Sequence, residues 1–322
     1  MQRIIPLSSI NTRQAWLKKL GGLSSISVKN KEWMTLLEEE TRHSLMIEGN
    51  IVSKQELRKI IGEGVASRHS AQEVLAYFEA AVSAYELAFQ QYKENDFQLT
   101  KPFVRQVHAL MFRGVDHFAY EPGAWRNGPI KIAQARVEAP PHHKVEKLIE
   151  SLVKTANQSA ANPIRKAAVF HSIFEQIHPF PDGNGRVGRI LLNYILIAHG
   201  LPNIAIKGLE TEKNEYFSAL ESSDAYVSEV LRGVKRWTRA QNKPFVGLEN
   251  LICKNLAISL DTVICTRFVD SGSVLQPLDE VAKHIKMSYQ SLRTACSQKK
   301  VISMKIGGRL LTHPVLLKKP TT

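Results

Sequence analysis

The sequence predicts a mainly α-helical protein with one β-hairpin in its middle and a small winged helix-turn-helix domain near its C-terminal end. Three observations support this prediction. Apolar residues recur every three to four positions through most of the chain, which is the spacing of helices that bury one face. Residues 125–140 break that spacing with prolines and alternating apolar residues. After about residue 240 the chain becomes basic, and its pattern changes to short helices followed by short strands.

The first hundred residues are expected to form several helices. Residues 30–50 carry apolar side chains at helical spacing. Ser53 stands three positions before Glu56, which is the capping box of a helix start. Residues 70–95 continue as a long helix with an apolar stripe, and Thr100 caps the next helix. We treat residues 1–100 as an N-terminal helical region.

The middle of the chain, residues 101–240, is expected to form a catalytic core. Gly-Pro and Pro-Pro pairs, with Ile130 and Ile132 in alternation, predict a short hairpin at 125–140. Helices are expected to resume at 144–157 and 162–177, and the second leads directly into a glycine-rich stretch.

Residues 241–322 form the third predicted domain. A helix at 278–285, a turn at 286–288, a second helix from Tyr289 and two strands within 301–313 outline a winged helix-turn-helix. Residues 231–322 hold 16 Lys or Arg against 5 Asp or Glu, whereas the preceding 230 residues hold 27 against 25. This surplus of positive charge indicates DNA as a possible partner of residues 241–322. Recruitment or homodimerisation without DNA is the alternative.

The cysteines and the apolar runs indicate the cellular environment of the protein. The three cysteines are scattered and lack metal-ligand spacing, which is typical of reduced thiols. The N-terminus shows no signal peptide, and the most apolar run, residues 190–198, is about half the length of a membrane span. We therefore expect a cytoplasmic protein without membrane contact.

The stretch HPFPDGNGRVGR, residues 178–189, combines several groups that act on phosphates. A helix that begins after a glycine-rich turn presents free backbone N–H groups to an anion. Asp182 is a hard oxygen ligand suited to Mg²⁺, and Arg186 and Arg189 lie one turn apart, so both could hold a polyphosphate. His178 suits a general base. Together these residues predict nucleotidyl or phosphoryl transfer.

This stretch resembles the signature of Fic-domain AMP-transferases, His-x-Phe-x-(Asp/Glu)-Gly-Asn-Gly-Arg-x-x-Arg, at every fixed position, and the resemblance extends over about residues 30–230. It implies that His178 deprotonates a Ser, Thr or Tyr hydroxyl of a target protein, which then attacks the α-phosphate of ATP. It implies that Asp182 holds Mg²⁺ and that Phe180 anchors the loop. The residues implied to contact ATP, including the Asn184 side chain and the more weakly matched Tyr216, are Gly183, Asn184, Gly185, Arg186, Val187, Gly188, Arg189 and Tyr216. The hairpin at about 125–140 resembles the flap that pairs with an extended target segment.

A second stretch, SLMIEGN, resembles the family's inhibitory pattern at Ser44, Glu48 and Gly49. An ion pair between Glu48 and Arg189 would then occupy the position of the γ-phosphate. The alternative is that Glu48 is a surface carboxylate at a helix end. Two other functions stay open: a nucleotide-sensing DNA-binding regulator with weak self-AMPylation, and an enzyme that removes AMP with the help of Glu48.

The remaining histidines are expected to have other roles. His108 lies on the apolar face of its helix and His171 precedes His178 by almost two turns, so both are interpreted as structural. His142 and His143 follow a double proline and are placed in a loop beside the flap.

Overall fold

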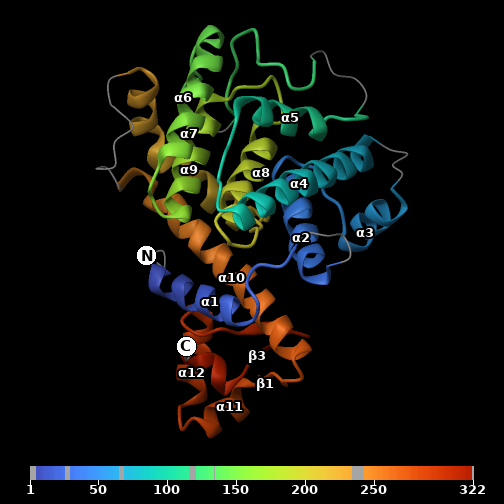
Figure 1. The fold of residues 1–322 in the computed structure, drawn as a ribbon, viewed down its shortest axis with the longest axis vertical. Coiled ribbons are helices and arrows are strands. Elements are labelled where there is room, and N and C mark those ends of the chain that lie inside the picture. Colours follow the sequence, from blue (N-terminus) through green and yellow to red (C-terminus); the bar gives the residue numbers. More distant parts are fainter. Residues whose placement is uncertain are drawn as a thin grey trace.

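The computed structural model describes residues 5–25, 30–64, 69–115, 121–133, 135–233 and 243–320. In these ranges the chain forms twelve α-helices and one small sheet, so the predicted mainly α-helical class is confirmed. Figure 1 shows most helices gathered around α8, with the sheet and the last two α-helices at the opposite end of the molecule. No helix in the described ranges is both long and apolar enough to cross a bilayer.

The helices of the main body follow the predicted order as far as α8, and α9 and α10 are added by the structure. Their bounds are α2 (Lys31–Ile47), α3 (Lys54–Glu63), α4 (His69–Glu94), α5 (Lys101–Met111), α6 (Val145–Gln158), α7 (Pro163–Ile177), α8 (Asn184–Ile197), α9 (Glu210–Leu231) and α10 (Val246–Asp270). Side-chain caps explain where several begin. The hydroxyl of Ser53 accepts a hydrogen bond from the backbone N–H of Glu56, and Thr100 caps α5 in the same way, as the sequence predicts.

Helix α8 lies at the centre of the body and is buried along nearly its whole length. It packs against α7, α4, α5 and α2. A helix that is buried on all sides needs such a cover, and residues 190–197, which are apolar apart from Asn193, receive it here. Because α8 is held in the core, the glycine-rich turn that precedes it is also held in place.

The predicted hairpin at 125–140 is not formed. Residues 125–133 and 135–140 contain no strand, while residue 134 lies outside the described ranges. The Arg126 guanidinium organises this loop instead, because it donates hydrogen bonds to the carbonyl oxygens of Gly128 at 2.9 Å and of Pro140 at 2.5 Å. Prolines at 129, 140 and 141 supply no N–H group, which removes donors that a strand ladder needs. We call residues 121–140 the flap loop.

Residues 271–320 form a C-terminal module. It contains β1 (Gln276–Pro277), α11 (Leu278–His284), α12 (Tyr289–Ser297), β2 (Met304–Ile306) and β3 (Arg309–Thr312). The strands are antiparallel in the order β1-β3-β2, and Met304 of β2 lies opposite Leu311 of β3. Both helices begin at the residues expected from the sequence. The predicted boundary between residues 240 and 241 lies outside the described ranges.

The first helix, α1 (Leu7–Lys19), packs against α10 and the C-terminal module. The buried Arg13 guanidinium forms an ion pair with Asp261 of α10 at 2.7 Å, and the Trp16 Nε1–H donates to the carbonyl oxygen of Lys318. In Figure 1, α1 and α10 lie side by side directly above the module. The two ends of the described chain are thus joined by packing.

Candidate active site

His178 ends α7 in a left-handed conformation, with φ +50°. Its Nδ1 lies 3.0 Å from the carbonyl oxygen of Glu175. A carbonyl oxygen only accepts hydrogen bonds, so Nδ1 carries the proton and Nε2 keeps its lone pair. Burial lowers the pKa of His178, and the nearby Arg126 lowers it further, against the opposing hydrogen bond to Glu175. The imidazole is therefore neutral and ready to accept a proton.

The side chains of Phe180 and Asn184 hold the loop after His178 in place. The Phe180 ring is buried and stacks on His108, with ring centroids 3.9 Å apart, as expected of an apolar anchor. The Asn184 side chain exchanges two hydrogen bonds of 2.8 Å with the backbone of Phe180. The Asn184 side chain thus holds the loop, and its predicted contact with phosphate stays a prediction.

His108 is a structural residue, as predicted. Its Nε2 lies 3.2 Å from the carbonyl oxygen of Asp182, and its Nδ1 accepts a hydrogen bond from the backbone N–H of Gly123 at 2.7 Å. Burial lowers its pKa to about 4. A neutral His108 thus ties the flap loop to the loop that carries Asp182.

The turn before α8 forms an anion cradle. Gly183 has φ +74°, and a Cβ there would lie 2.5 Å from the Met111 side chain, so the turn requires glycine. A Cβ at Gly185 would lie 2.8 Å from Oε1 of Glu48 and 3.0 Å from Nη1 of Arg189. The space above Gly185, at the N-terminus of α8, therefore holds a carboxylate oxygen beside a guanidinium, which marks it as a position for an anion.

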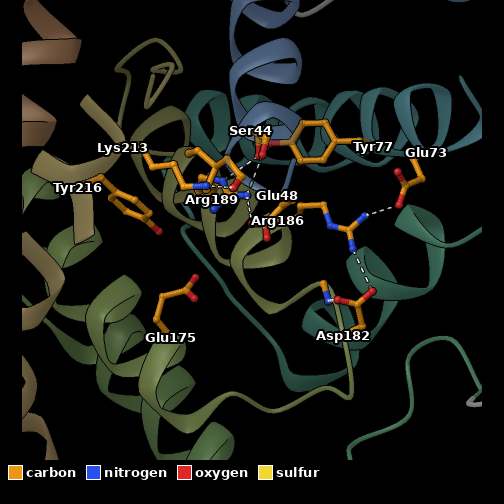
Figure 2. Close-up of polar contacts among 12 residues, drawn as sticks. Ser44, Glu48, Glu73, Tyr77, Glu175, Asp182, Arg186, Arg189, Lys213 and Tyr216 are labelled. Carbon is orange, nitrogen blue, oxygen red and sulfur yellow. Dashed lines mark hydrogen bonds and ion pairs between the residues drawn. The ribbon is translucent and has the colours of Figure 1, made fainter. Parts of the chain in front are cut away.

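Arg189 is the buried cation of this cradle. Its Nη2 lies 2.6 Å from Oε1 of Glu48, its Nε donates to the Ser44 hydroxyl at 2.8 Å, and its Nη2 donates to the Ser44 carbonyl at 3.1 Å. The predicted ion pair is therefore formed, and Figure 2 shows these side chains gathered above α8. Glu48 caps the C-terminus of α2, and Gly49 follows with φ +94°, so the end of the helix aims Glu48 at Arg189.

Electrostatics favour the charged forms of this pair. Burial alone would raise the pKa of Glu48, but the charge of Arg189 and its hydrogen bond outweigh this, so the pKa lies below its ordinary value. Burial would lower the pKa of Arg189, but Glu48 holds it above its ordinary value. Lys213 adds a hydrogen bond to the carbonyl oxygen of Ile47 at 2.6 Å, which fixes the end of α2 beside the site.

Arg186 and Arg189 have different partners in this structure, and their shared contact with one polyphosphate stays a prediction. Nη1 of Arg186 lies 3.2 Å from Glu73 and its Nη2 lies 3.1 Å from Asp182, and Figure 2 shows it directed away from Glu48. The one-turn spacing places both arginines on the same helix, but they leave it in different directions. Arg186 instead positions the Asp182 carboxylate.

Val187 and Gly188 do not face the cavity either. Val187 is buried in the apolar core, and its backbone N–H donates to the carbonyl of Gly183 within the helix. A Cβ at Gly188 would collide with Glu175, His171 and Phe174. Gly188 thus turns toward α7 and Val187 into the core, and their contacts with ATP stay predictions.

A cavity of about 380 Å³ lies over the cradle. The side next to the cradle is formed by Glu48, His178, Asp182, residues 183–185 and Arg189. Tyr216, Phe217 and Leu220 of α9 form the opposite side together with flap-loop residues. Tyr216 is buried, and its hydroxyl lies 2.8 Å from Nε2 of His171, so its ring is held in place at the wall.

Glu175 is a cavity residue that sequence reasoning missed. It lies on α7 one turn before His178, and burial raises its pKa to about 8 despite the opposing charge of Arg189. Its Oε1 has no hydrogen-bond partner among the described residues. A neutral carboxyl group thus faces the cavity beside the base. An acidic residue one helical turn before His178, in the stretch FHSIFEQI, was the available signal.

The donor set agrees with Mg²⁺ bound together with phosphates. Within the described ranges, no three His, Cys, Asp or Glu side chains gather into a metal-binding cluster. Asp182 supplies one carboxylate to the cavity, and its side chain is 49% exposed. Mg²⁺ in nucleotide sites commonly takes one or two carboxylates and completes its shell with phosphate oxygens and water. Asp182 alone therefore suffices for this role.

Comparison with known proteins relates the chain to one family. Residues 98–196 match the Fic/DOC family. A probable protein adenylyltransferase of Aquifex aeolicus is 33% identical over 201 residues, which are 62% of this chain and 60% of that protein. A protein adenylyltransferase of Caenorhabditis elegans is 25% identical over 227 residues, 68% of this chain and 43% of that protein. The chain thus spans about two fifths to three fifths of the length of these relatives.

Solved structures share the fold. A Fic-domain signalling protein of Bacteroides thetaiotaomicron superposes with a TM-score of 0.66 at 21% identity, covering 83% of this chain and 98% of that one. A Fic family protein of Desulfovibrio desulfuricans superposes with a TM-score of 0.55 at 19% identity, covering 96% of each chain. The second match includes nearly all of the chain described above.

Proposed function

The chain contains a domain of the Fic/DOC family at residues 98–196, and we propose that it transfers AMP from ATP to a hydroxyl group of a target protein. One observation carries this proposal. A neutral histidine, a carboxylate and a helix N-terminus with a buried arginine line the same cavity. The histidine can act as a general base, the carboxylate as a metal ligand, and the helix N-terminus with its arginine as a binding site for phosphates. Relatives named protein adenylyltransferases share this region.

The reaction follows from the roles of these groups. Nε2 of His178 takes the proton from a Ser, Thr or Tyr hydroxyl, whose oxygen forms a bond to the α-phosphorus of ATP. The bond between the α-phosphorus and the bridging oxygen breaks, and pyrophosphate leaves. The N–H groups at the start of α8 stabilise charge on the phosphate oxygens, while Arg189 binds the terminal phosphates. Mg²⁺, held by Asp182, supplies neutralising charge to the phosphates when it is bound.

We further propose that Glu48 inhibits this reaction. Its carboxylate lies above Gly185 and against Arg189, in the space where the terminal phosphate of ATP would bind. Both anions need the same cation, so ATP binds in a productive pose only when Glu48 leaves. The flap loop, which also lines the cavity, is proposed to hold the target segment.

Labelling with ATP that carries ³²P at the α-phosphate tests both proposals. We expect Glu48→Gly to raise labelling of the protein itself and of proteins in a cell lysate by about tenfold or more. His178→Ala in the Glu48→Gly background should abolish labelling. Glu94→Gly is the matched control, because it removes an exposed glutamate from the end of α4 and should leave labelling unchanged.

The outcomes separate the two proposals. Equal labelling by the wild type and Glu48→Gly, lost in His178→Ala, would retain AMP transfer and refute inhibition by Glu48. Label that appears only when ³²P is at the γ-phosphate would refute AMP transfer and indicate phosphorylation instead.

A further inference from the structure

Helix α12 exposes one continuous polar face. Leu292 and Cys296 point into the small core of the C-terminal module. The exposed residues occupy the other side of the helix at spacings of one, three and four positions, so they form a single face. These residues are Tyr289, Gln290, Ser291, Arg293, Thr294 and Ser297. The face carries hydrogen-bond donors and acceptors and no carboxylate.

A groove runs from this face to the turn between β2 and β3. The groove has a volume of about 700 Å³ and is lined by Tyr289 and Arg293 of α12 and by Lys305 and Arg309 of the two strands. Asp279 is the acidic residue that lines it. Lys305 and Arg309 are exposed beside Gly307 and Gly308, so two cations flank the tight turn.

The charge of the whole module has the same sign. Residues 271–320 contain nine Lys or Arg and two acidic residues, Asp279 and Glu280. One of the nine, Lys299, forms an ion pair with Asp261. Such a surplus attracts a polyanion, and its range is set by the salt concentration.

Packing within the molecule leaves this face open. Helix α1 contacts other residues of the module, because Ser9 donates to the carbonyl oxygen of Lys299, Arg13 to that of Val301 and Trp16 to that of Lys318. None of these three residues belongs to the exposed face of α12. Figure 1 shows α11 and α12 at the far end of the molecule, away from the catalytic cavity between α2, α7 and α8. A long rigid partner could therefore reach α12 without meeting the main body.

We propose that the C-terminal module binds double-stranded DNA, with α12 in the major groove and the β2–β3 turn against the phosphate backbone. The major groove admits one helix, and Arg and Gln side chains at its surface match the edges of guanine and adenine. Arg293 and Gln290 supply these two side chains on α12. Lys305 and Arg309 reach phosphates on the flank. The site lies apart from the AMP-transfer cavity, so the proposal stands without that reaction.

Fluorescence anisotropy of the full chain with a labelled DNA duplex of random sequence, about 30 base pairs long, tests the proposal. We expect binding that weakens steeply between about 50 and 200 mM salt. Lys305→Ala and Arg309→Ala should each reduce the slope of log affinity against log salt by about 1. Arg293→Ala should weaken binding to a sequence selected by the wild type by about 5- to 100-fold.

Lys93→Ala provides the matched control, since it removes one exposed positive charge from α4 and should leave DNA binding unchanged. Thermal unfolding of each variant verifies that the module remains folded. Three results would overturn the proposal: no binding by the wild type at about 50 mM salt, equal losses in Lys93→Ala and Arg293→Ala, or equal affinity for an RNA duplex, whose deep, narrow major groove excludes a helix.

Discussion

At the scale of single residues, His178 has its proton on the nitrogen that faces away from the reaction. Its Nδ1 donates to the backbone of Glu175, and burial lowers its pKa below the ordinary value of 6.5. The His178 imidazole therefore becomes protonated, and stops acting as a base, only as the pH falls through this lowered pKa. We expect the acid limb of the rate of AMP transfer to have its midpoint below pH 6.5, measured as initial rates of Glu48→Gly between about pH 5 and 8. A midpoint above 6.5 would contradict a desolvated, neutral base.

Gly185 provides a second test at this scale. Alanine there would place a Cβ in the space now shared by Glu48 and Arg189, which is the proposed phosphate position. We expect Gly185→Ala in the Glu48→Gly background to lower the rate of AMP transfer by at least about tenfold while changing the midpoint of thermal unfolding little, because the helix tolerates alanine.

Gly62→Ala is the corresponding control, because a Cβ at that position of α3 meets no atom within 4 Å. Equal rates for the Gly185→Ala and Gly62→Ala variants would place the phosphates elsewhere.

At the scale of elements, the flap loop depends on one side chain. Arg126 donates to the carbonyl oxygen of His178 at 2.8 Å, and its backbone N–H donates to that of Pro179 at 2.9 Å. Its guanidinium also contacts Gly128 within the loop and Pro140 at its end. Arg126 is therefore a positioning residue that sets the loop relative to the base.

We expect Arg126→Ala to lower kcat of the Glu48→Gly enzyme more than it raises KM for ATP, and to reduce the free energy of unfolding by about 1–3 kcal/mol, since buried carbonyl groups lose a donor. Steady-state kinetics and denaturant unfolding measure the two effects. Arg126→Lys should restore little of the lost kcat or of the lost free energy of unfolding, because a lysine ammonium lacks the branched guanidinium that donates to several carbonyl oxygens at once. Arg113→Ala, which removes an exposed arginine, serves as the control; a comparable loss there would refute the positioning role.

The sequence predicted the positions of helices better than the directions in which their side chains point. Periodicity and caps located α3 and α5 because hydrogen bonds at a helix start are local. The hairpin was predicted wrongly because alternation of Ile130 and Ile132 also occurs in an extended loop. Arg126 was not foreseen, since its partners lie as far as 52 positions along the chain. Spacing placed Arg186 and Arg189 on one helix, but the positions of Glu73 and Glu48, which decide their directions, depend on the tertiary fold.

At the scale of the whole molecule, one buried ion pair joins the first helix to the last third of the chain. Arg13 and Asp261 are each almost fully buried and lie 2.7 Å apart, and Lys299 of the module adds a second cation at 3.1 Å from Asp261. Removal of one partner leaves the other charge buried without full compensation. Breaking such a pair commonly costs about 3–5 kcal/mol.

We therefore expect Arg13→Met to lower the free energy of unfolding by about 3–5 kcal/mol, measured by denaturant unfolding. The double variant, Arg13→Met with Asp261→Leu, should recover most of this loss. Lys59→Met is the control, since Lys59 pairs with Glu63 at the surface, where the two side chains are 72% and 58% exposed, and it should lose less than about 1 kcal/mol. An equal loss in Lys59→Met and Arg13→Met would show that burial of the Arg13–Asp261 pair adds nothing.

The packing of α1 on α10 also has a consequence for the order in which the chain folds during its synthesis. Asp261 is 248 positions beyond Arg13, which corresponds to tens of seconds of translation at roughly 5–20 residues per second. Throughout that interval Ile10, Trp16 and Leu17, which are buried in the finished protein, lack the surface that covers them. Helix α1 is thus made long before α10 and packs late, and until then it presents an apolar segment of the kind that chaperones bind.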